Sequence, residues 1–268
     1  MNRRGFLAGS GGAALLAGLT AGVPAAMSIT GAAAQTSDAH TRIVIAGAGA
    51  AGLAMASRLR RGMPRATITV IDAKKEHHFQ PGFTLVGAGL WSPGHVTERN
   101  ADYMPRGVEW IEEAVAEFDP DADSVTTASG RKVAYDFLIV ATGLTLDYAA
   151  IEGMDASLIG KDGIASIYAG PEAAAASAAA IDRFLETGGV GLFGRPAGEM
   201  KCAGAPLKIT FIADDKARRQ SRRGAVELVY NAHGPAVFAV PPVNDKVKEM
   251  FSARGVAVNY GHVLKAID

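Results

Sequence analysis

Residues 41–52 read TRIVIAGAGAAG, and residues 66–72 read ATITVID. The β-branched residues of 41–46 predict a short buried strand, and residues 53–61 predict a helix directly after the glycines. A second strand is expected over 66–71 and ends at Asp72. Strand, glycine turn, helix and strand in this order form the βαβ unit that binds a dinucleotide. The stretch therefore predicts an α/β, Rossmann-like domain.

Each glycine of this turn is expected for a steric reason. Gly47 permits the tight turn, Gly49 lets the backbone approach a pyrophosphate, and Gly52 lets the helix pack closely on the strand. The N-terminus of the helix faces the phosphates, and Asp72, 20 residues after Gly52, can accept a hydrogen bond from a ribose hydroxyl. A Gly/Ala-rich turn without a ligand is the alternative, and the complete set of strand, helix and acidic residue disfavours it. The candidate phosphate-binding residues are Gly47, Ala48, Gly49, Ala50, Ala51 and Gly52.

Cys202 is the only cysteine of the chain, so it forms no internal disulfide. It lies in the run KCAGAPLKI, residues 201–209, before a helical pattern over 207–213. A helix N-terminus favours the reactive thiolate form of a cysteine. The alternative is a buried cysteine that acts as a small hydrophobic residue. Lys201 and Lys208 flank the sulfur and either stabilise a thiolate or face water.

A third element lies further along the chain. Residues 135–143 read YDFLIVATG and predict a buried strand that ends in Ala141, Thr142 and Gly143. Flavoproteins with two dinucleotide-binding domains are similar where the chain passes close to FAD and leaves for the second domain. This similarity favours FAD over NAD as the ligand of the first domain.

The first residues are expected to lie outside the fold. Residues 1–34 resemble a twin-arginine signal peptide, with Arg3 and Arg4 before an apolar Gly/Ala-rich stretch and small residues at 32–34. An uncleaved membrane anchor is the alternative. Export predicts the periplasm, or the periplasmic face of the inner membrane. A single cysteine excludes a disulfide framework in that oxidising compartment.

The remaining chain divides into two expected domains. Residues 35–153 would form the N-terminal half of an FAD-binding domain, and 154–268 a second Rossmann-like domain that carries the cysteine. A Gly/Pro-rich excursion is expected over 74–104. Further strands are expected at 108–112, 114–118, 124–127, 190–193, 226–230 and 256–260, and further helices at 172–180 and 244–254.

The charge pattern argues against several other classes of protein. The 27 basic and 27 acidic residues balance, and the basic run 216–223 is expected to be the solvated end of a helix. A nucleic-acid partner is therefore not expected. His77 and His78 have no further ligand at a suitable spacing, so no metal is expected either.

Taken together, these residues resemble sulfide:quinone oxidoreductases of the type found in mitochondria and related bacteria. The similarity spans roughly residue 42 to the C-terminus. Its most specific part is KCAGAPLKI, residues 201–209. The other runs are HFQP with TLVGAG, residues 78–81 and 84–89, and GVEWI with ATGL and LDY, residues 107–111, 141–144 and 146–148.

The resemblance implies a role for each part. FAD would be bound by the glycines of 47–52 and by Asp72 with Ala73, its adenine would meet the backbone of Val115, and its flavin end would lie near Gln80 and Pro81. Ala141, Thr142 and Gly143 would line the flavin, and Cys202 would be the redox cysteine on the flavin side. In such enzymes sulfide attacks a cysteine–cysteine sulfur bridge and the electrons pass through the flavin to a membrane quinone. Sulfane sulfur leaves on an acceptor that the sequence does not identify.

The chain departs from the family pattern in its second half. It has no second cysteine, and it lacks the returning half of the FAD domain and the amphipathic region that docks on the membrane. We therefore expect the N-terminal portion of a longer enzyme, with the C-terminal part missing. An inactive FAD-binding fragment is one alternative. An NADH:quinone oxidoreductase is another, which the sequence GRPAGE at 194–199 disfavours, and a flavocytochrome c type relative is a third.

Overall fold

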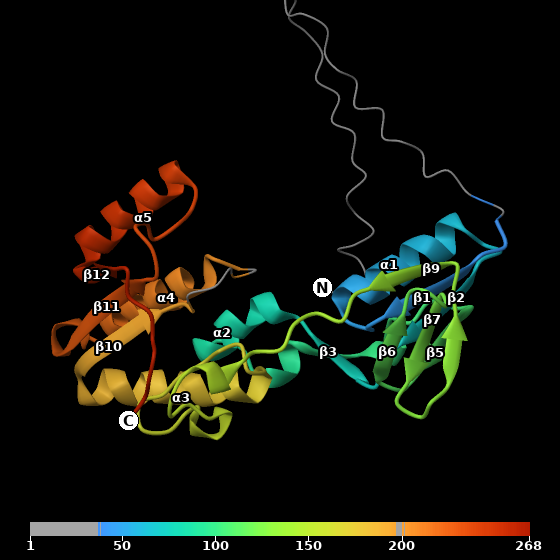
Figure 1. The fold of residues 1–268 in the computed structure, drawn as a ribbon. Helices are drawn as coiled ribbons and strands as arrows, with labels where there is room; N and C mark the ends of the chain where they lie inside the picture. The colour runs from blue at the N-terminus through green and yellow to red at the C-terminus, as the bar shows by residue number, and fades with distance from the viewer. Residues whose placement is uncertain (1–36, 38, 197–199, 201) are drawn as a thin grey trace, which may run out of the picture. The chain divides into compact units, whose positions relative to one another are not determined.

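The computed structural model describes residues 37, 39–196, 200 and 202–268. The expected signal peptide lies outside these residues. Figure 1 shows two parallel sheets, one built from strands in the first half of the sequence and one from strands near its C-terminus. This arrangement confirms the predicted α/β class.

The first parallel sheet has the strand order β5-β2-β1-β9. Its central strands carry the β-branched residues of the opening sequence, and Ile43 pairs with Ile68 of β2 and Phe137 of β9. Helix α1 connects β1 to β2 and packs on the sheet through Leu53 and Ala56. The bounds are β1 Arg42–Ala46, α1 Ala50–Gly62, β2 Thr67–Ile71, β5 Val108–Ile111 and β9 Phe137–Val140.

A small antiparallel sheet follows β5. It consists of β6 Val115–Asp119, β7 Ser124–Thr127 and β8 Lys132–Ala134. Val125 and Tyr135 pack with Val44 and Ile111 of the parallel sheet in one buried cluster. Apolar burial therefore joins the two sheets.

The excursion after β2 contains more regular structure than the sequence suggests. Strands β3 Glu76–His78 and β4 Thr97–Arg99 pair antiparallel, and the short helix α2 Phe83–Gly87 lies between them in the chain. Phe83, Val86 and Val96 form a buried cluster with Ala174 of the later helix α3, Pro171–Thr187. Short 3-10 turns occur at Gln80–Gly82, Pro93–His95 and Asn100–Asp102.

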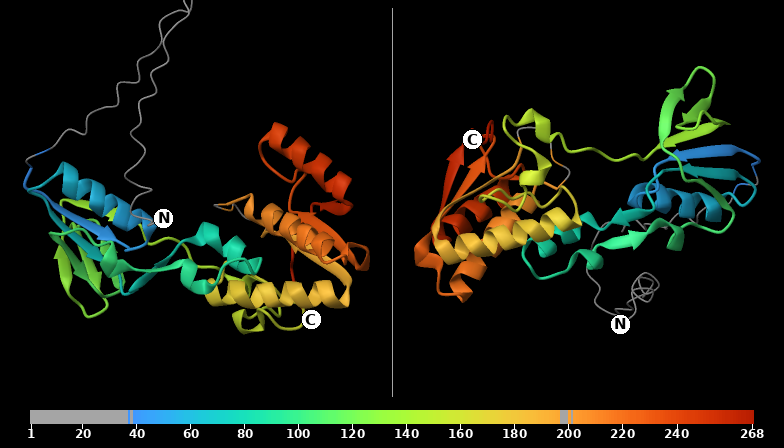
Figure 2. Two further views of the ribbon diagram at one scale, coloured as in Figure 1. Left: turned by 180° about the vertical axis from the view of Figure 1, so that it is seen from behind. Right: turned by 90° about the horizontal axis from the view of Figure 1, so that it is seen from below.

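The second parallel sheet has the order β10-β11-β12. Figure 2 shows it together with its helices from two further sides. The bounds are α3 Pro171–Thr187, β10 Gly189–Gly194, α4 Ala205–Arg219, β11 Val226–Ala232, α5 Pro241–Arg254 and β12 Val256–Tyr260, with 3-10 turns at Tyr148–Ala150, Ala156–Leu158 and Arg223–Ala225. The expected order of strands and helices in this half is thus the observed one.

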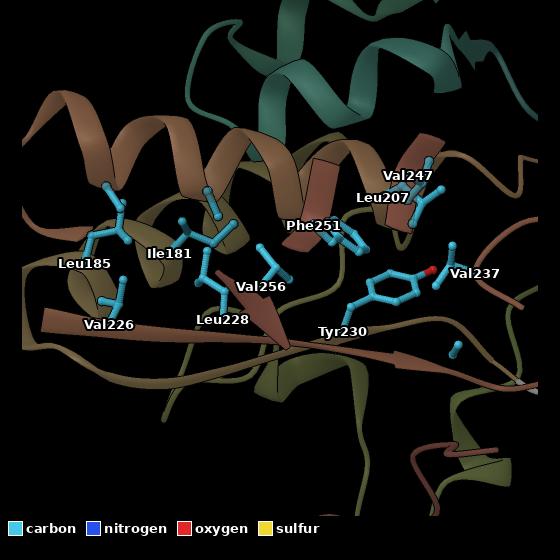
Figure 3. Packing of buried hydrophobic residues seen from close by; sticks show 13 residues of the cluster. Ile181, Leu185, Leu207, Val226, Leu228, Tyr230, Val237, Val247, Phe251 and Val256 are labelled. Atoms are coloured by element: carbon cyan, nitrogen blue, oxygen red, sulfur yellow. The ribbon is translucent and has the colours of Figure 1, made fainter. Parts of the chain in front are cut away.

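All three helices of this half contribute to one core. Leu185 of α3 and Phe251 of α5 lie against Leu228 and Tyr230 of β11, as Figure 3 shows. The opposite face of β10 is open among the described residues, where Leu192 is 70% exposed. One face of the second sheet is therefore a packed core, and on the other face the edge strand β10 carries exposed apolar side chains.

The basic run 216–223 lies at the end of α4 as expected, but it is not simply solvated. Asp214 is fully buried and forms ion pairs with Arg218, Arg223 and Arg254 at 2.8, 2.7 and 2.7 Å. Burial alone would raise the pKa of Asp214, but the hydrogen bonds from the three guanidinium groups lower it. These arginines tie the end of α4 to the end of α5, where Arg223 also donates to the Arg254 carbonyl oxygen.

Candidate active site

The turn between β1 and α1 forms a cradle at the carboxyl end of the first parallel sheet. Gly47 has a φ of 111°, which favours glycine. A Cβ on Gly52 would collide with the Gly47 carbonyl oxygen, whereas a Cβ on Gly49 would meet nothing within 4 Å. The turn is closed toward the sheet and open at Gly49. A bound pyrophosphate needs this geometry.

The start of α1 is suited to a negative charge. Ala50 and Ala51 are its exposed first residues, and its first turn contains no acidic side chain. The first N–H groups of a helix have no partner within the helix, and the dipole of this 13-residue helix adds a positive potential there. These residues therefore fit a dinucleotide phosphate.

Asp72 follows β2 and holds the turn from one side. Its Oδ2 accepts a hydrogen bond from the Ala48 N–H at 2.7 Å, and its Oδ1 accepts one from the Lys74 N–H at 2.8 Å. Each carboxylate oxygen can accept another hydrogen bond, so the predicted contact with a ribose hydroxyl stays open. The bond to Ala48 is a structural role that the sequence did not predict.

The end of β9 lies against the glycine turn. The Ala141 N–H donates to the Ala46 carbonyl oxygen at 2.7 Å. A Cβ on Gly47 would collide with the Ala141 carbonyl oxygen. The structure therefore brings Ala141, the first residue of Ala141–Gly143, against the turn 47–52, with Thr142 and Gly143 exposed directly after it.

The other predicted cofactor residues lie on separate elements. Ala73 is exposed next to Asp72, and Val115 begins β6. Gln80 and Pro81 form the 3-10 turn that leads into α2. Their contacts with adenine and flavin stay predictions.

Cys202 is half-buried and lies three residues before α4 begins. Its carbonyl oxygen accepts a hydrogen bond from the Ala205 N–H at 3.0 Å, which fixes the chain at the entry to the helix. The predicted position of Cys202 near a helix N-terminus is thus the observed one.

A cavity of about 410 Å³ lies between α2 and α4. It is lined by Pro81, Thr84, Leu85, Lys208, Phe211 and Ile212.

Two polar side chains accompany the thiol. The Tyr168 hydroxyl interacts with the side chains of Cys202 and Thr84. Burial raises the pKa of Tyr168, the neighbouring Cys202 raises it further, and the hydrogen bond with Thr84 opposes the rise. Tyr168 therefore stays a protonated hydrogen-bond donor near neutral pH. The sequence patterns predict no role for Tyr168, because Thr84, Tyr168 and Cys202 are far apart in the chain.

The two histidines of the excursion have structural contacts. His77 Nδ1 lies 2.8 Å from the Asn100 side-chain oxygen, and the His78 ring lies 6.0 Å from the Phe83 ring. Burial lowers the pKa of His78. Within the described ranges, no three His, Cys, Asp or Glu side chains gather so that they could hold a metal ion.

Comparison with known proteins agrees with this geometry. The family model "Pyridine nucleotide-disulphide oxidoreductase" matches residues 41–181, which include the glycine turn and the end of β9. The chain belongs to this family. Membership confirms the α/β dinucleotide-binding fold and the prediction of FAD as cofactor.

The similar members of the family have names that agree with the resemblance inferred from the sequence. The chain is 34% identical to the mitochondrial sulfide:quinone oxidoreductase of Dictyostelium discoideum and 33% identical to that of Mus musculus, in each case over 85% of this chain and 50% of the relative. A crystal structure of the sulfide:quinone oxidoreductase from Aquifex aeolicus has the same fold, with a TM-score of 0.72 and 24% identity over 85% of this chain and 52% of that one. The chain spans about half the length of the curated relatives it matches.

Among the residues that the structure describes, no helix is both long enough and apolar enough to cross a bilayer.

Proposed function

We propose that this chain is the FAD-binding, thiol-bearing portion of a sulfide:quinone oxidoreductase. The overall reaction removes two electrons from sulfide and gives them to a quinone. Hydrosulfide, one proton and the quinone become sulfane sulfur and the quinol. The sulfane sulfur leaves on an acceptor thiol or sulfur nucleophile.

The placement of the single thiol supports this proposal most directly. Cys202 is half-buried, not enclosed, and lies three residues before a 15-residue helix whose N-terminus favours a thiolate. A thiol that only fills space needs none of these features. The 34% identity to a named sulfide:quinone oxidoreductase extends over the segment that contains it, because the match covers 85% of the chain.

Two groups of residues have separate roles in this proposal: one binds the cofactor and the other supplies the thiol. The glycine turn and the start of α1 hold the cofactor phosphates, and Asp72 keeps the turn in shape while it contacts the ribose. FAD, when bound, supplies the acceptor for two electrons. Cys202 supplies the sulfur nucleophile that meets sulfur from the substrate. The family's second cysteine is not among the 268 residues, so a sulfur bridge to Cys202 needs a thiol from another source.

The location of the protein is part of the proposal. Arg3 and Arg4 with the apolar residues after them support export by the twin-arginine route. That route carries folded proteins, which suits a protein that binds its cofactor before crossing the membrane. We therefore place the protein in the periplasm or at the periplasmic face of the inner membrane. A fusion of residues 1–34 to a folded reporter tests this, and retention of the reporter in the cytoplasm contradicts it.

An anaerobic titration tests the activity. The purified chain is reconstituted with FAD, and the flavin absorbance is followed while sulfide or NADH is added. Bleaching by sulfide alone supports the proposal, whereas bleaching by NADH alone supports an NADH-dependent relative. A bound flavin that neither donor reduces indicates an FAD-binding fragment without this activity.

A further inference from the structure

The Tyr230 hydroxyl lies buried toward the carboxyl end of the second parallel sheet. Tyr230 belongs to β11 and is 0% exposed, and its ring lies 5.4 Å from the Phe251 ring in the core. Within the described residues, no donor or acceptor forms a hydrogen bond with this hydroxyl. Figure 3 shows it beside Val237, which follows β11 in the chain. Because buried hydroxyl groups are nearly always hydrogen-bonded, this one needs a partner from outside the chain, a water molecule or a ligand.

The strand register brings a guanidinium group to the same place. Phe193 of β10 pairs with Tyr230, and Arg195 follows two residues later, directly after the strand. Since side chains alternate between the two faces of a strand, Arg195 leaves the sheet on the face that carries Phe193 and Tyr230. The pKa of Tyr230 agrees with this placement, because burial raises it and the nearby charge of Arg195 opposes the rise.

His233 lies at this end of the sheet as well. It is the first residue after β11, and its Nε2 lies 3.3 Å from Nη2 of Arg195. Both residues are half-buried. The 15-residue helix α4 begins at the same end, because it connects the carboxyl end of β10 to the parallel strand β11, and its N-terminus adds a positive potential. An arginine, a histidine and a buried phenol thus meet where the helix dipole is positive.

We propose that this end of the second sheet binds a small inorganic oxyanion, such as sulfate or phosphate. The guanidinium group of Arg195 donates two parallel hydrogen bonds to the anion. His233 donates a third through a ring N–H, and the Tyr230 hydroxyl donates a fourth from the core side. All three side chains can donate, which matches a ligand that only accepts. None of them has a part in the proposed function.

The chain at this position favours a free anion over the phosphate of a nucleotide. A dinucleotide needs glycine where the backbone turns under its pyrophosphate, as the first sheet provides at Gly49. After β10 the chain instead has Arg195 and Pro196, so side chains stand where a pyrophosphate would approach. Glu199 and Lys201 are charged residues of the same connection that lie outside the described residues, and they stay unchanged in every variant of the test.

Isothermal titration calorimetry of the whole chain tests the proposal, with FAD present in excess so that the glycine turn is occupied. Sulfate and phosphate are titrated at constant ionic strength in a chloride buffer, and ADP and NADH serve as nucleotide probes. Wild type is compared with Arg195→Gln, His233→Gln and Tyr230→Phe. Arg219→Gln is the matched control, because the Arg219 side chain is 78% exposed and pairs with Asp215 at the other end of α4.

The proposal predicts that wild type binds one anion per chain. Arg195→Gln should weaken binding by about 10-fold or more, and His233→Gln and Tyr230→Phe by about 3- to 10-fold, as expected for lost hydrogen bonds to a charged ligand. Arg219→Gln should bind as wild type does. Without an anion, Tyr230→Phe should melt no lower than wild type, because the removed hydroxyl has no partner within the described residues. The anion should raise the melting temperature of wild type more than that of Tyr230→Phe.

The opposite results are equally clear. Equal affinity in wild type and the three site variants overturns the proposal and leaves an adventitious ion only. No binding of either anion overturns it as well, and tighter binding of ADP or NADH than of both anions assigns the site to a nucleotide instead. If Arg195→Gln does not fold, Tyr230→Phe decides, because it keeps the ring and its packing. Sulfide takes no part in these measurements, so their outcome is independent of the proposed function.

Discussion

The chain contains two strand–helix–strand crossings with the same topology and different turns. In β1–α1–β2 only three residues, 47–49, separate the strand from the helix, and backbone contacts at glycines close the turn. In β10–α4–β11 the strand ends at Gly194 and the helix begins at Ala205. The longer connection holds Arg195, Pro196 and Cys202. The turn of the first crossing thus lacks side chains where a ligand would approach, whereas the connection of the second crossing carries a thiol.

The two crossings are also stabilised at different places. The first is held at its turn, where Gly52 lies against Gly47. The second is held at the far end of its helix, where Asp214 gathers three arginines. Substitutions in the two crossings should therefore differ in how they affect stability and FAD binding.

The largest expected effect is at Asp214. Asp214→Asn leaves three guanidinium groups without their buried carboxylate and should lower the free energy of unfolding by about 3–5 kcal/mol at pH 7. Urea unfolding measures it. Asp215→Asn is the control, because the Asp215 side chain is 51% exposed and pairs only with Arg219 among the described residues.

The same variant carries a pH dependence. The pKa of Asp214 is lowered in the folded protein, so its stabilisation is fully present above the unfolded-state value of about 3.9. It is lost as the pH falls through the lower folded-state value. The difference between wild type and Asp214→Asn should therefore shrink below pH 4. A constant difference from pH 7 to pH 2 would contradict the ion-pair account.

Gly52→Ala should have the next largest effect. The added Cβ collides with backbone, not with the end of a side chain. It should lower the free energy of unfolding by about 2–3 kcal/mol. It should also weaken FAD binding, because the turn changes shape. Thermal unfolding and FAD fluorescence quenching measure the two losses. Gly62→Ala, at the other end of α1 where a Cβ meets nothing within 4 Å, should leave both close to wild type. Wild-type stability in Gly52→Ala would show that the helix does not pack as described.

Gly49→Ala should separate ligand binding from folding. Since a Cβ there meets no protein atom, the free energy of unfolding should change by less than about 0.5 kcal/mol. The Kd for FAD should rise at least about 10-fold, because the methyl group obstructs the pyrophosphate. Fluorescence titration with FAD measures it. An unchanged Kd would mean that the cofactor does not approach the chain at Gly49.

The smallest effect is expected on the open face of β10. Leu192→Ala should change the free energy of unfolding by less than about 0.5 kcal/mol, because Leu192 is 70% exposed. Leu228→Ala on the packed face should lower the free energy of unfolding by about 2–5 kcal/mol. Urea unfolding of the two variants compares the faces. Similar losses in both would show that the open face is covered in solution.

The sequence predicted the features that depend on local patterns. The β-branched runs and the glycines identified β1, α1, β2 and β9, because each is dictated by neighbouring residues. The five-residue helix α2 was missed, since it is shorter than the span over which a helical period can be recognised. The buried position of Asp214 was also missed, because its arginine partners come partly from another helix.

The site was predictable to the same extent. The glycine turn and Cys202 follow from composition and spacing. The contact of Tyr168 with Thr84 and Cys202 depends on three segments that meet only in the folded chain. No single stretch of sequence contains a signal for such a contact.

The central claim is that sulfide gives its two electrons to the flavin of the first crossing only when the thiol of the second crossing is present to take up the oxidised sulfur. The most direct measurement compares the rate of flavin bleaching by sulfide in wild type and in Cys202→Ser, both reconstituted with FAD and with their Kd for FAD measured alongside. We expect bleaching in wild type, its loss in Cys202→Ser, and the same Kd for FAD in both. Equal bleaching rates in the two proteins would contradict the account, because sulfide would then reach the flavin without the thiol.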